Sequence, residues 1–555
     1  MLKKFKLPVG AAALLILVSG FLIPADRYFE IARSLDIFST LFKEVNANYV
    51  DEVDPYRLAE KGIGAMLESL DPYTTFIPEE SAEAFSIQTT GQYAGIGALV
   101  VNLDKKVLIS QPYIDFPAHR AGVRVGDEIV AVDGKSVENL PVSAVTTMLK
   151  GAPKTQVEVV FNRPGEKKEI KLLLTRERIK VTNIAWYGMV DEQTGYIGLA
   201  EFTTGAGREI QEAIRQMKKS GMKNLILDLR DNPGGLLHEA VNIVGLFIPK
   251  GSEVVKTKGR LEDFNKTYKT LSQPEDLELP VAVLVSNGSA SASEIVAGAL
   301  QDYDRAVLVG QKTFGKGLVQ TTRSLSYNAQ LKVTTARYYI PSGRCIQALN
   351  YASKNEQGEA QRNADSLKQA FKTAGGRIVY DGGGLDPDVT TENIAAMPIL
   401  AQLAGSGLMF LYAREFCGVH PAPADVRKFS LNDAQYSDFT AWLKKRGFTY
   451  QTELDVRLKE LEALAVAQES SGDLLASVVQ LKNNLQTARE ELFIKHRKTI
   501  SEFLEEEIAF HYRLEEGRVL SSLKSDKELL MAKKLFSDPV SFSKILSGHG
   551  AYPGR

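Results

Sequence analysis

The spacing of hydrophobic residues changes character along the chain. From 27 to about 86 it is helical, with apolar side chains recurring at alternating intervals of four and three residues, at Ile31, Leu35, Phe38, Phe42 and Val45. Between about 88 and 179 it becomes a series of short segments separated by Gly and Asp and interrupted by one amphipathic stretch at 142–150. The short segments predict strands at 95–101, 106–111, 128–132, 156–162 and 169–175. This second pattern predicts a small β-rich, barrel-like domain with one main helix.

Beyond residue 180, predicted strands alternate with predicted helices. A strand at 195–203 is followed by an amphipathic helix at 208–219 and a strand at 224–229. A further apolar strand begins at Val281 and leads, after a turn at Asn287-Gly288, into an apolar helical segment; another strand follows at 306–310. Such alternation predicts an α/β core.

The last part of the chain predicts helices. Leucines follow heptad-like spacing around 454–461 and 474–492, which indicates either a helical bundle, an oligomerisation arm or a simple packed appendage. The apolar segment Met397–Tyr412 contains Gln402 and two glycines, so it predicts a buried helix rather than a membrane span. The chain is thus expected to be a multidomain α+β protein, divided into 1–26, 27–86, 87–179, 180–388 and 389–555.

The N-terminus carries an export pattern. Lys3, Lys4 and Lys6 precede an apolar run over 7–23, which ends at Pro24. A basic segment followed by an apolar one is typical of a secretory signal. No clean small-residue cleavage site precedes Asp26, so an uncleaved membrane anchor is favoured over a removed signal, with cleavage after Ser19-Gly20 the alternative.

Composition excludes several functions. The content of 44% hydrophobic and 24% charged residues is that of an ordinary globular protein. A net charge of −1 gives no general attraction to nucleic acid, which is therefore not an expected partner. Cys345 and Cys417 are distant in sequence and lack a ligand-like spacing, so two free buried thiols are predicted rather than a disulfide or a zinc site.

Residues 281–320 concentrate the candidate chemistry. A buried strand breaks at Asn287-Gly288 and leads into a serine-dense helix start, where unpaired amides point outward. That arrangement suits a nucleophile beside an oxyanion site. The residues alone do not choose between Ser289, Ser291 and Ser293, and Ser291 with Glu294 also fits a helix capping box.

Two glycine-containing loops add to this stretch. Gly234 and Gly235 follow the strand at 224–229, where they either turn backbone amides toward a reacting group or form a plain tight turn. Gly310, Gly315 and Lys316 have the spacing of a phosphate-binding loop, but Gly317 replaces the required Ser or Thr and the next residues predict a strand. Lys316 is then either a solvated loop residue or a general base, which requires a pKa well below about 10.4.

One segment resembles a PDZ domain. The residues Tyr93-Ala-Gly-Ile-Gly-Ala98 and the stretch AHRAGVRVGDEIVAVDGKSV at 118–137 carry this resemblance. It implies that the backbone amides of a short loop receive the C-terminal carboxylate of a peptide, which adds as a strand at the sheet edge. The loop residues concerned are Gly95, Ile96, Gly97 and Ala98.

The combination of motifs resembles the carboxy-terminal processing proteases, the tail-specific peptidases of family S41. It consists of SNGSASASEI, FGKGLVQ, LRDNPGG, the upstream PDZ-like segment and the closing GGGLDPD, and it spans about 27–388. The resemblance implies a ClpP/crotonase-like core in which Ser291 is the nucleophile, Lys316 the general base and Gln320 the residue that orients the lysine. It also implies an oxyanion hole formed by the amide of Ala292 and one from Gly234 or Gly235.

The expected protein is a serine endopeptidase of the bacterial cell envelope, on the periplasmic side. Its expected partners are polypeptide tails and a second copy of the chain, bound through N- or C-terminal helices. The family resemblance implies that the PDZ domain can control access to the active site, so a regulatory partner is expected as well. No metal or other cofactor is expected. Competing interpretations are a non-catalytic PDZ scaffold on a protease-like core and a crotonase-like acyl-CoA enzyme. No histidine offers a Ser-His-Asp site of comparable quality, His238 being the nearest.

Overall fold

The computed structural model describes residues 25–355, 358–392, 397–468 and 472–549, in two units that divide after Phe76. The N-terminal unit contains α2 (Ala25–Asn48) and α3 (Pro55–Glu68), which confirms the helical pattern; the short strand β1 (Thr75–Ile77) was not predicted. Asp54 starts α3 by accepting N–H groups of the first turn. The predicted export segment lies outside the described residues, and no described helix is long and apolar enough to cross a membrane.

The β-rich domain is an antiparallel sheet in the order β3-β4-β5-β7-β8, in which β3 is an edge strand. The strands lie within a few residues of the predicted ones, and helix α6 (Val142–Leu149) contacts the inner face. Their bounds are β3 (Ala98–Leu103), β4 (Lys106–Pro112), β5 (Glu128–Val132), β7 (Gln156–Asn162) and β8 (Ile170–Thr175). The remaining elements here are α4 (Ala82–Thr90), β2 (Gln92–Gly95), α5 (Pro117–Arg120), β6 (Lys135–Ser136) and β9 (Glu177–Lys180).

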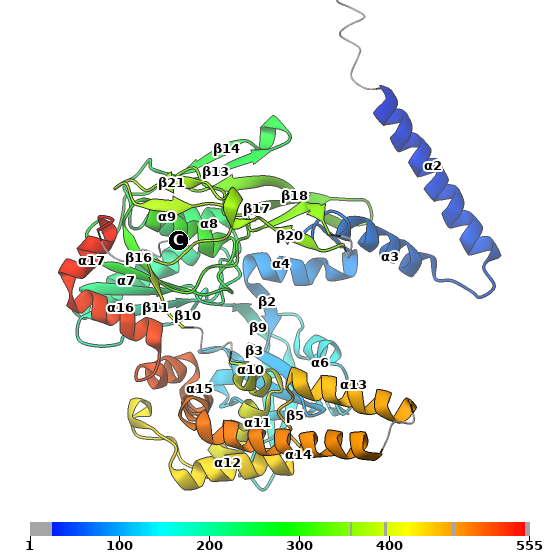
Figure 1. Ribbon diagram of the computed structural model, residues 1–555, viewed down its shortest axis with the longest axis vertical. Helices are drawn as coiled ribbons and strands as arrows, with labels where there is room; N and C mark the ends of the chain where they lie inside the picture. Colours follow the sequence, from blue (N-terminus) through cyan, green and yellow to red (C-terminus); the bar gives the residue numbers. More distant parts are fainter. Residues whose placement is uncertain (1–24, 356–357, 393–396, 469–471, 550–555) are drawn as a thin grey trace, which may run out of the picture. The chain divides into compact units, whose positions relative to one another are not determined.

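A six-stranded sheet forms the α/β core (Figure 1). Its order is β10-β11-β12-β15-β16-β23, parallel from β11 onward. The strands are β10 (Ile184–Met189), β11 (Thr194–Leu199), β12 (Asn224–Asp228), β15 (Val281–Val285), β16 (Ala306–Gly310) and β23 (Val389–Thr390). The neighbouring strands β15 and β16 are buried along their whole length, as expected of a parallel sheet that is covered on both faces.

Different parts of the chain cover the two faces of this sheet. Helices α7 (Ala206–Lys219), α8 (Leu237–Val244) and α9 (Ala292–Asp302) pack on one face. The other face is covered by α16 (Lys527–Ser537) and α17 (Pro539–Leu546), from the end of the chain (Figure 1). The predicted C-terminal extension therefore includes helices that complete the core layer.

A second sheet borders the core in the order β18-β13-β14, with β17 paired to β18. Its strands are β13 (Glu253–Gly259), β14 (Lys266–Lys269), β17 (Leu318–Ser324) and β18 (Gln330–Tyr339), which confirms a strand after the Lys316 loop. Two small hairpins follow, formed by β19 (Leu349–Lys354) with β20 (Ala360–Arg362) and by β21 (Ala370–Lys372) with β22 (Ile378–Tyr380).

Helices α10 to α15 form a separate bundle with its own apolar cluster. The leucine-rich segments form α13 (Glu453–Ala467) and α14 (Gly472–Lys495), as predicted; the other helices are α10 (Pro398–Gly405), α11 (Leu408–Val419), α12 (Asp433–Lys445) and α15 (Arg497–Ser522). The single helix predicted over Met397–Tyr412 is wrong, because Gly407 adopts a positive φ of 69° that separates α10 from α11. Left-handed backbone of this kind ends a helix, and glycine adopts it without steric cost.

Candidate active site

Ser291 stands at the junction between β15 and α9, immediately before the first helical residue. The hydroxyls of Ser289 and Ser293 are fully buried and donate hydrogen bonds to the carbonyls of Leu229 and Asn232, at 2.7 and 2.9 Å. Ser291 is only half-buried. The structure thus separates three serines that the sequence could not, because two of them have structural bonds to the neighbouring loop.

The backbone of Ser291 is strained. Its φ of 58° and ψ of −112° lie outside the regions that a residue with a Cβ normally adopts. Such conformations cost on the order of 1–3 kcal/mol and persist where the surrounding fold enforces them. The strain turns the chain sharply between the strand and the helix.

This strain gives a stability prediction. Ser291→Gly is expected to unfold at a higher temperature than Ser291→Ala, because only Gly removes the Cβ while both variants lack the hydroxyl. We expect the difference to be about 1 kcal/mol, measured by thermal unfolding of both variants under one condition. An Ala variant as stable as the Gly variant would show that the backbone at Ser291 is relaxed.

Glu294, on the first turn of α9, links the serine to the lysine loop. Its carboxylate is fully buried, and one oxygen, Oε2, accepts the backbone N–H groups of both Ser291 and Lys316, each at 2.9 Å. The other oxygen accepts the hydroxyl of Thr313 and the N–H of Gly315. Burial raises the pKa of Glu294 to about 7, although these four donors favour the ionised form. A single carboxylate therefore fixes the backbone positions of Ser291 and Lys316 relative to each other.

Tyr338, on β18, makes a second link between the same two residues. Its buried hydroxyl lies 3.1 Å from the carbonyl oxygen of Ser291 and 2.6 Å from that of Lys316. Ser291 and Lys316 are thus tied together through both their N–H and their C=O groups. Neither Glu294 nor Tyr338 was predicted as a site residue; Glu294 was considered only as a helix cap.

Gln320 lies on β17, four residues after Lys316 and beside a β-bulge between Val319 and Gln320. Its side-chain amide donates to the hydroxyl of Thr334 on the paired strand, at 3.1 Å. The predicted role of Gln320 in orienting Lys316 stays a prediction.

The Gly234-Gly235 loop packs directly against the serine. A Cβ on Gly234 would lie 2.7 Å from the Ala292 nitrogen and 3.0 Å from the Ser291 Cβ, so no side chain fits there. The N–H of Gly234 donates to the side chain of Asn232 within its own loop. Among the residues described, the N–H groups of Gly235 and Ala292 donate no backbone hydrogen bond. Those two amides are therefore the candidate pair for an oxyanion.

The predicted carboxylate loop of the PDZ-like domain joins β2 to the edge strand β3. Gly95 ends β2, Ala98 begins β3, and between them Ile96 is buried in the domain core. Gly97 has a φ of 76°, and a Cβ there would lie 2.5 Å from Phe116. Because β4 is the only strand that pairs with β3 among the described residues, the other edge of β3 has no strand partner there and suits an added strand.

The structure gives less support to a histidine-based site, a metal site or a disulfide. His238 lies on α8 with its side chain 61% exposed and its Nε2 atom 3.7 Å from the Glu239 carboxylate. In the part of the chain that the structure describes, no cluster of three potential metal ligands is found. Cys345 and Cys417 are free thiols, and each is half-buried rather than fully buried.

Comparison with known families identifies three parts of the chain. Peptidase family S41 matches residues 193–352, the PDZ domain family matches 108–163, and a probable PDZ-protease C-terminal helical domain matches 399–536. Among solved structures, the photosystem II D1 C-terminal processing protease is 28% identical, covering 64% of this chain and 92% of that one, with a TM-score of 0.34.

Relatives with assigned names are similar over more than half of the chain. A probable CtpA-like serine protease of Staphylococcus aureus strain COL is 35% identical over 316 residues, 56% of this chain and 62% of the relative. A carboxy-terminal-processing protease of Bartonella bacilliformis is 37% identical over 330 residues, 58% of this chain and 74% of the relative. With its PDZ domain followed by an S41 core, the chain belongs to the carboxy-terminal-processing proteases of peptidase family S41.

Proposed function

We propose that this protein is a serine endopeptidase that captures C-terminal or unstructured polypeptide ends through its PDZ domain and cleaves them at a Ser291–Lys316 site. The observation that carries the proposal is the double link between these residues. The Glu294 carboxylate accepts their two N–H groups, and the Tyr338 hydroxyl shares its one proton between their two carbonyls. A fixed relative position of nucleophile and base is what covalent catalysis requires.

The proposed reaction is acyl transfer. Neutral Lys316 takes the proton of the Ser291 hydroxyl as the oxygen attacks a peptide carbonyl, and Gln320 orients the lysine. The developing oxyanion receives the N–H groups of Ala292 and Gly235. The proton then passes to the leaving amine, and water, activated by the same lysine, releases the new carboxylate from the acyl-enzyme.

Capture of the substrate end is assigned to the PDZ domain. The free edge of β3 supports addition of a peptide strand, and the loop from Gly95 to Ala98 supplies amides for a terminal carboxylate. Export to the cell envelope, membrane anchoring, a regulatory partner and self-association through terminal helices remain predictions from the sequence. The second candidate function is a PDZ scaffold built on a catalytically inactive protease core. The hydrogen bonds that link Ser291 to Lys316 argue against it, because an inactive core does not require them.

The proposal is tested with the full-length protein and an unfolded polypeptide prepared with either a free or an amidated C-terminus. Cleavage is followed by mass spectrometry. We expect the free-carboxylate form to be cleaved faster, and Ser291→Ala and Lys316→Ala to lose at least about 10³-fold in rate. Lys312→Ala is the matched control, because Lys312 lies in the same loop but pairs with Asp386 at 2.9 Å.

Each result separates the candidates. Wild-type activity in either single variant would contradict the Ser-Lys mechanism. Equal cleavage of the two substrate forms would contradict capture of the terminal carboxylate. A wild-type protein that binds the free-carboxylate peptide but cleaves neither form would favour the scaffold.

A further inference from the structure

Helix α16, from the C-terminal extension, contacts the three core strands that lead into the proposed active site. Strand β12 leads to the Gly234-Gly235 loop, β15 leads to the turn before Ser291, and β16 leads to the loop that carries Lys316. In a parallel sheet the carboxyl ends of neighbouring strands lie at one edge, where α/β enzymes place their sites. The start of α16 is therefore in a position to hold the bases of these loops.

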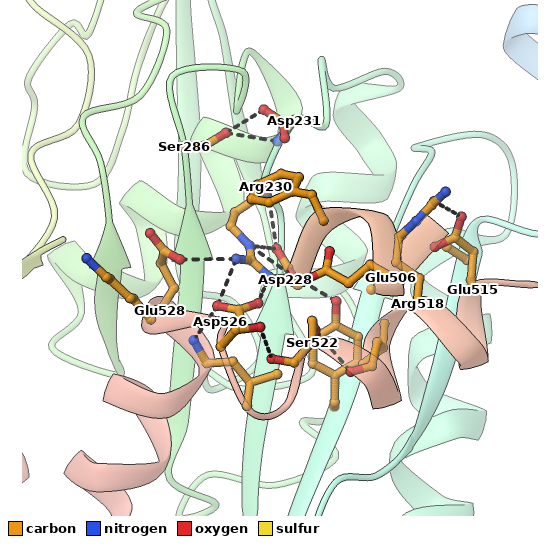
Figure 2. Close-up of a pocket in the computed structure, with 18 of the residues that line it drawn as sticks. Asp228, Arg230, Asp231, Ser286, Glu506, Glu515, Arg518, Ser522, Asp526 and Glu528 are labelled. Atoms are coloured by element: carbon orange, nitrogen blue, oxygen red, sulfur yellow. Dashed lines mark hydrogen bonds and ion pairs between the residues drawn. The ribbon is translucent and has the colours of Figure 1, made fainter. Parts of the chain in front are cut away.

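Arg230 joins the start of α16 to the Gly234-Gly235 loop. Its guanidinium donates to both carboxylate oxygens of Asp526, at 3.1 and 2.8 Å, and to Glu528 at 3.3 Å (Figure 2). On the core side it donates to Asp228, the last residue of β12, at 2.6 Å. A guanidinium that is bound to a carboxylate through two hydrogen bonds is fixed in direction as well as in distance. Helix α16 therefore helps to fix where this loop leaves the sheet.

The residue after Arg230 extends the link to the turn before Ser291. The N–H of Asp231 donates to the hydroxyl oxygen of Ser286 at 3.0 Å, and that hydroxyl donates to the Asp231 carboxylate at 2.9 Å (Figure 2). Ser286 directly follows β15. Asp231 has a positive φ of 55°, which a residue with a Cβ keeps only where the surrounding contacts enforce it. Tertiary contacts therefore set the geometry of this loop.

Glu528, in the first turn of α16, extends the contact to the lysine loop. Its Oε1 atom accepts the side-chain amide of Gln311 and the hydroxyl of Thr391, each at 2.6 Å. Gln311 directly follows β16 and begins the loop that carries Lys316. The Oε2 atom of the same carboxylate accepts the guanidinium of Arg230. One side chain of the C-terminal extension thus contacts the starts of both the lysine loop and the Gly234-Gly235 loop.

We propose that Glu528 is a positioning residue for the peptidase reaction, which sets the lysine loop and the Gly234-Gly235 loop relative to each other. The inference rests on the proposed Ser291–Lys316 mechanism. A displacement of about 1 Å far from the reacting atoms can lower an enzymatic rate by about 10²-fold, so a contact at the base of two loops can affect catalysis. The competing interpretation is that these contacts only dock α16, as the surface pair of Lys533 with Asp191 does.

The test is steady-state kinetics of the full-length protein on an unfolded polypeptide with a free C-terminus. We expect Glu528→Gln to lower kcat at least about tenfold with KM unchanged. A Gln side chain has one acceptor oxygen, so its NH₂ must face either the Gln311 amide or the Arg230 guanidinium, both of which are donors. Leu535→Ala is the matched control, because Leu535 belongs to the apolar cluster between α16 and the sheet and makes none of these hydrogen bonds. It should lower the Tm and leave kcat unchanged at temperatures well below that Tm.

A reciprocal exchange separates the positioning role from simple docking of the helix. In the double variant Gln311→Glu/Glu528→Gln, the amide at position 528 can donate to the carboxylate at position 311 while its oxygen accepts Arg230. We expect this variant to recover most of the kcat that Glu528→Gln loses.

The outcomes distinguish this inference from the proposed function. Unchanged kcat in Glu528→Gln, an equal loss of kcat in Leu535→Ala, or no recovery in the double variant would each overturn the positioning role of Glu528. A wild-type protein that cleaves nothing would overturn the proposed Ser291–Lys316 mechanism and this inference together. An active wild type with an equally active Glu528→Gln variant would overturn the inference alone.

Discussion

Replacing Glu294 with Gln is expected to lower the rate of polypeptide cleavage by about 10²-fold in a protein that remains folded. All four groups around this carboxylate are donors, and two of them are the backbone N–H groups of Ser291 and Lys316. A Gln side chain must direct its own NH₂ at a backbone N–H in either orientation. Ser291 and Lys316, the proposed nucleophile and base, would then shift relative to each other. Steady-state kinetics on the purified variant measures the effect, with the exposed Glu278→Gln as control.

The Glu294→Gln variant is also expected to change how the thermal stability of the protein depends on pH. Because the folded protein raises the pKa of Glu294 from 4.5 to about 7, this group stabilises the fold below its ordinary pKa and loses that contribution as the pH rises through about 7. The Tm of the wild type should therefore fall more between about pH 5 and pH 8 than that of Glu294→Gln. Parallel pH dependences, or wild-type kinetics in the variant, would contradict the positioning role.

Arg377→Met is expected to destabilise the protein by about 3–5 kcal/mol, the cost of leaving a buried carboxylate without its cation. Arg377 is 1% exposed, and its guanidinium donates to Asp304, Asp388 and the carbonyl of Gln301. Burial raises the pKa of Asp388, the last residue of GGGLDPD, and Arg377 opposes that shift. Asp388 also accepts the N–H of Leu308 on β16. The closing motif thus fastens the end of α9 to the sheet.

Chemical denaturation measures this loss, and a matched control is available in Arg215→Met. Arg215 pairs with Glu275 at the surface, where solvent screens the interaction, so its replacement should leave the unfolding midpoint unchanged within error. If the unfolding midpoint of Arg377→Met were equally unchanged, the hydrogen bonds from Leu308 and Gln301 would be sufficient to stabilise the buried Asp388 carboxylate.

Local patterns predicted most elements of the fold. The strands β5, β7 and β16 have the bounds that the apolar runs indicated. The break at Gly407 was missed because the segment is apolar on both sides of it, and only the local φ distinguishes two short helices from one long helix. The role of α16 and α17 was missed for a different reason. Their apolar faces show that they are buried, but not which surface covers them.

The site was predictable only in part. The sequence shows three serines with identical side chains at 289, 291 and 293. What distinguishes them is that Ser289 and Ser293 donate hydrogen bonds to backbone carbonyls that lie far away in sequence. The sequence indicated Glu294 only as a helix cap. Its hydrogen bonds to Gly315 and Lys316, which follow it by 21 and 22 residues, depend on the tertiary fold. Tyr338 had no signal in the sequence, because a strand tyrosine is ordinarily a core residue.

The placement of α16 and α17 has a consequence for biosynthesis. One face of the peptidase sheet, including Ile226, Leu284 and Val309, remains uncovered until residues 527–546 have been made and docked. Because this sheet carries the strand that leads to Ser291, we expect the proposed nucleophile to reach its final position only after α16 and α17 have docked. The order of synthesis itself would keep the nascent protein from cutting other unfolded chains around it.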